Sequence, residues 1–511
     1  MKNIKNIIVA IGVVTLLGSS CKNSLDLAPV SSLSNESYWQ TPDQFNAFVT
    51  GIHSRFRSHT GNFQRLGEMR SDIFGLDPGT TASFTGEATQ GLERMWLHTL
   101  DLDNAGLNDF GGFYTNINQI NLLIDKLNNT TIVSDADKTY YLGQAYGMRA
   151  FYYFQLLRTW GKVVIQTEPI NSIDISNLAK AASTEAEVMT LIKSDIESSL
   201  TNFGSSYVFK GAKSQWSKPA SLMLKAEAFL WTSYREGGTQ DATTAKTALT
   251  DIQTNVPALT LLTNFADVFS TTTKGNNEMI FASRNQLMES SLDFVAGSFV
   301  PQSGLIANFH DSIANRQFNV STDNWGGLLR APVKIATYRQ YNELDSRRLV
   351  TIQPAYRKTG DTYTIAGAFV KKFSGEQNAG SRNYTNDFPV YRYADLLLLL
   401  AEAKVALGED PSVEINRVRT RAFGTTYNPA VHAYPNQAID SNPKEAILQE
   451  RLLEFIFEGK RWYDLRRMGD SFVFAHTSLP SGEAYRLLWP IDRNSLTNNR
   501  LLEQNPGYPQ F

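Results

Sequence analysis

Apolar residues at helical spacing dominate the chain. Thr41-Pro42-Asp43 combines an N-cap residue, a first-turn proline and an acidic first turn, and apolar residues then follow at helical intervals as far as Phe56. Thr184 and Glu187 have the spacing of a capping box ahead of another apolar face. Further helices are predicted near residues 113–127, 134–160, 217–234, 389–407, 411–422 and 443–458.

Three long stretches lack this periodicity. They cover about residues 57–108, 201–215 and 285–388, and strand-like pieces such as EMIFASR (278–284) and AFVKKF (368–373) lie beside or within them. Loops of this length in a compact protein are usually functional or contain elements that have not been recognised. The helices fall into pairs, but no period of about 34 residues is visible, so the sequence alone does not establish a helical repeat.

The first 20 residues have the three parts of a secretory signal. Lys2 and Lys5 precede the apolar run IIVAIGVVTLL, and Gly18-Ser19-Ser20 follow it. The run is about half of the ~20 residues that a membrane-spanning helix needs. We therefore expect residues 1–20 to be removed.

Cys21 is the only cysteine of the 511 residues, so it has no partner for an internal disulfide. Leu17-Gly18-Ser19-Ser20-Cys21 is similar to a bacterial lipobox, although its leucine lies at −4 rather than −3. Acyl chains on Cys21 would tie the protein to a membrane. We expect residues 21–40 to form the lipid anchor and tether, and residues 41–511 to form a single domain.

Composition and charge narrow the range of possible functions. The formal net charge of −2 suggests neither a nucleic-acid partner nor a polybasic membrane surface. The six histidines show no metal-ligand spacing, and no HExxH, CxxC, GxSxG or P-loop motif occurs. Glu445, Glu450, Glu454 and Glu458 are interpreted as a salt-bridged helix face. No catalytic constellation is found, which favours a binding protein over an enzyme.

Several segments in order match one family. The N-terminal matches are LDLAPVSSLSNESYWQTPDQF, GFYTNINQINLLIDKL and GQAYGMRAFYYFQLLRTWG. The later ones are NNEMIFASR, YNELDSRRLVTI, FPVYRYADLLLLLAEAKVALGED, INRVRTRAFG, ERLLEFIFEGKRWYDLRRMG and LWPIDRNSLTNNRLLEQNPGY. Over nearly the whole mature chain the sequence resembles the SusD/RagB lipoproteins of the Bacteroidetes. It departs at Gln144, where glutamate is common, and at Met148, where leucine is usual.

The resemblance implies a mostly α-helical SusD-like fold, with TPR-like helix pairs as scaffold and an irregular ligand-binding region on it. Family members are lipid-anchored at the outer membrane and exposed at the cell surface. They lie as a lid over a SusC-like TonB-dependent outer membrane barrel, capture an oligosaccharide, or in some branches a peptide, and pass it into the barrel. The resemblance implies no bond chemistry and no required cofactor, although some members carry a bound calcium. The matched charged motifs are interpreted as scaffold rather than site.

The resemblance implies that the ligand binds to the stretches 57–108 and 285–388, although no family motif identifies individual binding residues. Loops on a rigid scaffold commonly carry binding residues, and aromatic rings with amide, Arg and Asp side chains suit sugars. Candidate ligand-binding residues are Trp96, Trp325, Asp72, Arg70, Asn324 and Tyr338. The loop composition leans toward glycan over peptide. The alternative to a binding protein is an enzyme, namely a secreted glycosidase with a toroidal helical fold. Asp72 or Asp323 would then be candidates for its catalytic carboxylates.

Overall fold

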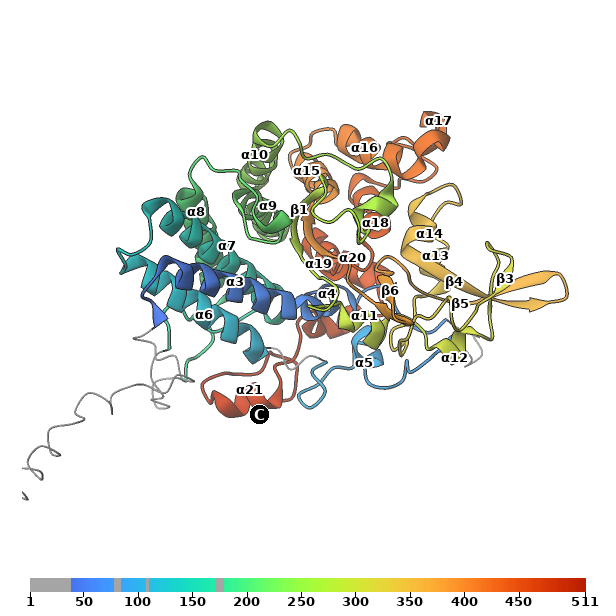
Figure 1. Cartoon of the computed structure of the whole chain (residues 1–511), viewed down its shortest axis with the longest axis horizontal. Coiled ribbons are helices and arrows are strands. Elements are labelled where there is room, and N and C mark those ends of the chain that lie inside the picture. Colours follow the sequence, from blue (N-terminus) through green and yellow to red (C-terminus); the bar gives the residue numbers. More distant parts are fainter. Residues whose placement is uncertain (1–37, 78–83, 107–109, 171–178) are drawn as a thin grey trace, which may run out of the picture.

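The computed structural model describes residues 38–77, 84–106, 110–170 and 179–511 (Figure 1). Signal residues 1–20, Cys21 and most of the expected tether lie outside these ranges. The longer helices are α3 (Pro42–Ser58), α4 (Thr60–Glu68), α6 (Phe110–Asn128), α7 (Asp135–Trp160), α8 (Glu185–Phe203), α9 (Lys218–Glu236), α10 (Thr239–Asn255), α15 (Tyr393–Ala406), α16 (Ser412–Phe423), α18 (Pro443–Phe455) and α19 (Arg461–Met468). The shorter ones are α5 (Glu93–Trp96), α11 (Asp293–Ser298), α12 (Ser303–Ile306), α13 (Ile335–Tyr338), α14 (Arg347–Thr351), α17 (Pro429–His432), α20 (Asp470–His476) and α21 (Arg493–Asn498).

The long helices form the scaffold. α7 packs against α6, α8 and α9, and α10 packs against α9 and α15 (Figure 1). The local signals explain where the helices begin. The predicted capping box is present, because the Thr184 backbone N–H donates to the Glu187 carboxylate at 2.8 Å and the Glu187 N–H donates to the Thr184 hydroxyl at 3.2 Å. The mostly helical fold is therefore confirmed.

Short sheets interrupt the helices. β1 (Met279–Ser283) pairs antiparallel with β8 (Phe388–Arg392), with Ser283 opposite Phe388. A four-stranded sheet has the order β3-β2-β4-β5, where β2 is His310–Asp311, β3 is Arg316–Gln317, β4 is Ile352–Thr359 and β5 is Thr362–Val370. β6 (Glu376–Asn378) and β7 (Ser381–Asn383) form a separate hairpin.

Some sequence predictions of individual elements were wrong. The helix predicted from 389 begins at Tyr393, because the aromatic and β-branched run at 388–392 pairs with β1 and is buried along its whole length. The helix predicted over 443–458 ends at Phe455, ahead of two positive-φ residues, Phe457 and Gly459. The stretch 57–108, predicted to be irregular, contains α4. The strand-like pieces are confirmed, because EMIFASR contains β1 and AFVKKF begins within β5.

A network of buried ion pairs joins β8 to α18 and their neighbours. Glu454 is fully buried and accepts hydrogen bonds from Arg347 (3.0 Å), Arg392 (2.6 Å) and Arg421. Glu458 pairs with Arg392 and Lys372. Buried charges persist only when they are paired and hydrogen-bonded, so these groups must fold together. Glu450, Glu454 and Glu458 therefore do form salt bridges, but in the interior and with partners from other segments rather than along one helix face.

Among the described residues, no helix is both long enough and apolar enough to cross a bilayer.

Candidate functional site

The two predicted binding stretches interlock. The Gly75 N–H donates to the Pro332 carbonyl (3.1 Å), and the Lys334 N–H donates to the Ile73 carbonyl (3.0 Å). Further along, the carboxylate of Glu87 pairs with Arg330 at 3.0 Å. The resulting region carries α5, α11, α12 and strands β2–β5 along the lower and right-hand parts of the molecule (Figure 1). Loops far apart in the sequence thus form one surface on the helical scaffold.

Trp325 lies beneath this surface. Its side chain is buried, with 7% of the residue exposed, and the edge of the Phe369 ring packs against it at 5.1 Å between centroids. The Arg382 guanidinium lies 4.4 Å from the centroid of the Trp325 ring. Arg382 is fixed there because it also donates to the carbonyls of Asn324 (2.9 Å) and Ser374 (2.7 Å). A sugar could stack on this indole only if Arg382 moved.

Asn324 is half-buried and belongs to a polar rim around Trp325. Its side-chain oxygen accepts from the Ser303 hydroxyl (2.6 Å), and its amide nitrogen donates to the Gly380 carbonyl (3.3 Å) in the β6–β7 turn. We define the loop rim as the polar residues that surround this contact. Its members are Ser303, Asn324 and Arg382, which are joined by hydrogen bonds, Gln377 and Asn378, which lie in the strand paired with Arg382 and Ser381, and Gln302, which precedes Ser303 in the chain.

Trp96 is also a core residue, with 7% exposure, at the end of α5. A Cβ on Gly75 would lie 3.6 Å from its ring, so the indole packs directly on the interlocked backbone. The neighbouring Leu97 is 55% exposed. Trp96 therefore positions the loop, and its ring face is not presented to solvent.

Arg70 is buried between two indoles, with its guanidinium 4.5 Å from the ring centroid of Trp462 and 5.6 Å from that of Trp489. It donates to backbone carbonyls of residues 486–488. Burial lowers the pKa of Arg70 to about 10. Tyr338 is buried as well, and the Arg348 guanidinium lies 4.6 Å from its ring centroid. Among the described residues, no contact joins the side chain of Arg70 or of Tyr338 to the loop rim.

Asp72 and Asp323 are both held as ion pairs. Asp72 accepts two hydrogen bonds from Arg461, at 2.9 and 2.7 Å. Burial alone would raise the pKa of Asp72, but the Arg461 guanidinium outweighs it and lowers that pKa. Hydrogen bonds from Arg316 likewise lower the pKa of Asp323. A glycosidase general acid needs a raised pKa, so neither aspartate has the electrostatics of that role.

The structure brings Asn324 and Trp325 together with Arg382, and it places Trp96, Arg70, Asp72 and Tyr338 within the packed interior or its edge. Whether any of these six binds ligand stays a prediction. The sequence analysis did not single out Ser303 or Arg382, because polar residues in a long irregular stretch carry no local signal of which of them meet. Among the described residues, no group of three or more His, Cys, Asp or Glu side chains could hold a metal ion. The calcium expectation stays open, since calcium also uses carbonyl oxygens.

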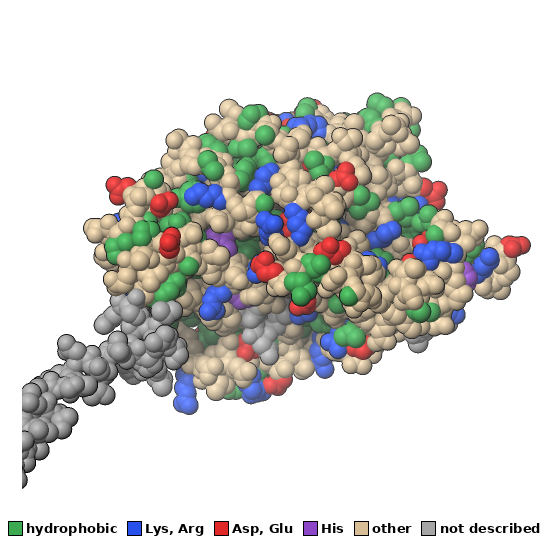
Figure 2. Space-filling model, viewed as in Figure 1, with side chains coloured by type: hydrophobic (Ala, Val, Ile, Leu, Met, Phe, Trp, Pro, Cys, Tyr) green, Lys and Arg blue, Asp and Glu red, His purple; other side chains and the backbone are tan. Residues whose placement is uncertain are grey.

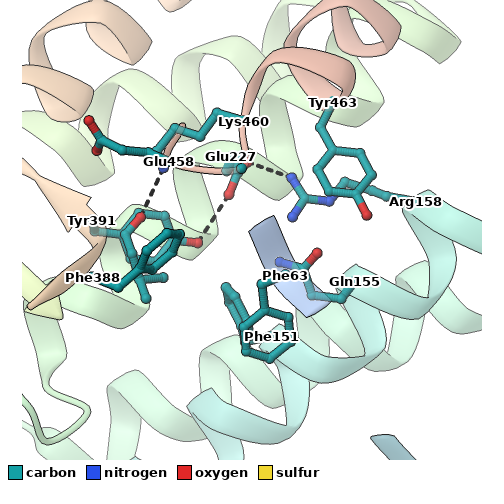
Figure 3. A pocket seen from close by; sticks show the side chains of 12 residues that line it. Phe63, Phe151, Gln155, Arg158, Glu227, Phe388, Tyr391, Glu458, Lys460 and Tyr463 are labelled. Carbon is teal, nitrogen blue, oxygen red and sulfur yellow. Dashed lines mark hydrogen bonds and ion pairs between the residues drawn. The ribbon is translucent and has the colours of Figure 1, made fainter. Parts of the chain in front are cut away.

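A small internal cavity between α7, α9 and α19 is shown in Figure 3. It is lined by Gln155, Arg158, Glu227, Tyr391 and Lys460 with several aromatic rings. Its volume of about 30 Å³ is too small for a sugar ring and has room for a single water molecule. Gln155 Oε1 and Arg158 Nε lack protein partners there, and one water could accept from the guanidinium and donate to the amide oxygen. This cavity is part of the scaffold and not a ligand site.

Comparisons with known proteins agree with this architecture. The model of the SusD family matches residues 321–508, and a model described as "Starch-binding associating with outer membrane" matches residues 54–234. B. fragilis NanU is 43% identical with a TM-score of 0.87, covering 94% of this chain and 100% of NanU. A SusD superfamily protein from Bacteroides vulgatus is 40% identical with a TM-score of 0.85, covering 92% and 100%.

A more distant structure shares the fold alone. It is surface glycan-binding protein A from Bacteroides thetaiotaomicron, in complex with laminarihexaose, which is 19% identical with a TM-score of 0.67. The two proteins overlap over 91% of this chain and all of the other.

The helical scaffold, with the interlocked loops packed on it, is the fold of the SusD superfamily. The chain belongs to the SusD family.

Proposed function

We propose that this protein captures oligosaccharides at the loop rim and delivers them to a SusC-like TonB-dependent barrel in the outer membrane. The observation that carries the proposal is the rim itself, where amide, hydroxyl and guanidinium groups converge on a rigid core. Asn324, Ser303 and Arg382 supply donors and acceptors of the kind that bind sugar hydroxyls. Figure 2 shows acidic and basic side chains interspersed on the visible face, without a field of one sign that would select a highly charged ligand.

Relatives support the glycan class. One family model describes starch binding at the outer membrane, and one solved structure with this fold contains laminarihexaose. A peptide ligand for the same kind of lid is the runner-up, and the binding experiment below distinguishes the two.

Titration calorimetry of the protein against a panel of oligosaccharides and peptides tests the proposal. We expect an oligosaccharide to bind without cleavage products after overnight incubation. Asn324→Ala should weaken that binding about tenfold, because a lost hydrogen-bond partner at a binding surface costs ~1–1.5 kcal/mol. Trp325→Ala is less informative, since removing a buried ring also disturbs packing.

The matched control is Asn129→Ala, which removes an exposed asparagine bonded only within its own helix end. It should leave affinity unchanged. Binding of peptides alone, weakened by Asn324→Ala, would move the proposal to the peptide lid. Cleavage products would contradict the proposal outright.

We further propose that acylated Cys21 anchors the protein to the outer membrane and that it faces the cell exterior. In the native host, Cys21→Ser should move the protein from the membrane fraction to the soluble fraction, because each buried methylene contributes ~0.8 kcal/mol of membrane affinity. Fractionation followed by immunoblotting measures this. A variant that stays membrane-bound would show that the lipid anchor is not what holds it.

A further inference from the structure

A second cavity lies apart from the loop rim, between α13–α14 and α16–α18 on the upper right of Figure 1. Its volume is about 400 Å³, which can hold a small molecule or a short chain end. None of its lining residues belongs to the loop rim. Any ligand that it takes therefore binds independently of the proposed glycan site.

Two arginines that line this cavity are neutralised by neighbouring carboxylates. Arg347 is paired with Asp345 (2.7 Å) and Glu450 (2.6 Å). Arg419 is paired with Glu450 (3.0 Å) and with Asp440 (2.7 Å). Either arginine could donate to a ligand only by breaking a buried ion pair, and breaking such a pair strongly destabilises a protein.

Arg339, the third arginine that lines the cavity, is different. It is exposed, and within the described parts of the chain it forms no ion pair and no hydrogen bond through its side chain. Arg347 and Arg419 are thus neutralised by their carboxylate partners, whereas no carboxylate among the described residues pairs with Arg339. An anionic group of a ligand can pair with Arg339.

His432 adds a directed donor. It is buried, its ring stacks on Phe423 at 3.7 Å between centroids, and its Nδ1 accepts from the Asn428 backbone N–H at 3.0 Å. In the neutral imidazole the hydrogen must therefore lie on Nε2. Nε2 forms no hydrogen bond among the described residues, and His432 lines the cavity.

One part of the remaining wall is aliphatic. It consists of Val431 and Ile439, which are 51% and 59% exposed, and of Leu453. The rest of the lining consists of Tyr341, Phe423 and the amide side chains of Gln340, Asn342 and Gln449. The aliphatic part matches another aliphatic side chain. The cavity therefore combines an aliphatic wall with a cation and a neutral N–H donor.

We propose that this cavity binds the free C-terminal carboxylate of a peptide whose last residue is aliphatic. Arg339 and His432 Nε2 receive the carboxylate, and Val431 and Ile439 receive the side chain. Charge-assisted hydrogen bonds to a carboxylate are about twice as strong as neutral ones, so the carboxylate dominates the affinity.

Calorimetric titration with N-acetyl-alanyl-leucine tests this proposal. We expect saturable binding with a Kd on the order of 1 mM or tighter, and binding at least tenfold weaker for the same peptide with a C-terminal amide. Arg339→Gln should weaken binding of the acid about tenfold and leave binding of the amide unchanged. Ile439→Ser should weaken binding of both, because it removes the aliphatic wall.

Arg500→Gln is the matched control, since Arg500 is likewise an exposed arginine but lies after α21. It should change nothing. Equal affinity for acid and amide, or no detectable binding of the acid, would overturn the proposal. Equal binding of glucuronate would overturn the peptide assignment. Asn324→Ala should leave peptide binding intact, so failure of the glycan proposal and failure of this one are distinguishable.

Discussion

Replacing Glu454 by Gln should lower the free energy of unfolding by about 3–5 kcal/mol, because it leaves buried arginines without their shared counter-ion. The Glu454 carboxylate is fully buried and accepts from Arg347, Arg392 and Arg421. Burial alone would raise the pKa of Glu454, but the three guanidinium groups outweigh it and hold that pKa far below its usual range. Denaturant unfolding of the variant and the wild type measures the difference.

The pH dependence of this difference in unfolding free energy provides a further check. A carboxylate whose pKa is lowered by folding contributes stability that is complete above its unfolded pKa, about 4.3, and is lost as the pH falls toward the lowered value. The gap between wild type and Glu454→Gln should therefore be full at pH 7 and narrow in acid. Glu409→Gln removes a partly exposed partner of Lys246 and should cost less than about 1 kcal/mol. Equal losses for the two variants would show that burial of the pair is not what matters.

Gly67→Ala should destabilise the fold by about 3 kcal/mol or more, because there is no room for a methyl group between α4 and the turn after α18. A Cβ on Gly67 would lie 1.7 Å from the carbonyl oxygen of Gly459 and 2.5 Å from its carbon. Both atoms are backbone, and Gly459 is itself held at a φ of +73° against α4. Relief would require the two segments to separate. Thermal and denaturant unfolding will show the loss.

Gly51→Ala is the matched control for this substitution. Gly51 is also a helical glycine, in α3, but a Cβ there meets nothing within 4 Å. Alanine should stabilise that helix by about 0.5–1 kcal/mol. A Gly67→Ala protein as stable as the wild type would mean that α4 can move away from Gly459 freely.

The sequence predicted helices best where a cap and a long apolar period coincide, as at Thr41 and Thr184. It failed where tertiary pairing decides the conformation. Residues 388–392 are extended because β1 lies beside them, which no local pattern reveals. α10 was missed because its buried face consists mainly of alanine among many threonines, a weak hydrophobic signal.

The candidate site, too, was predicted from the sequence only in part. The sequence predicted the two stretches that come together, but it did not reveal which side chains remain accessible. Trp96 and Trp325 are ordinary loop tryptophans in the sequence, and their burial depends on contacts with Gly75 and with Arg382 and Phe369, respectively. The charged motifs near the C-terminus were interpreted as scaffold, and their ion pairs do lie inside the molecule.

The interlocking of residues 73–75 and Glu87 with residues 328–334 has a consequence for synthesis. The early segment leaves the ribosome long before its partner exists, and loops closed over such a separation form slowly. The interlocked loop surface therefore cannot assemble before residues 328–334 have been synthesised. A chain truncated before residue 328 would lack this surface even if its N-terminal helices formed.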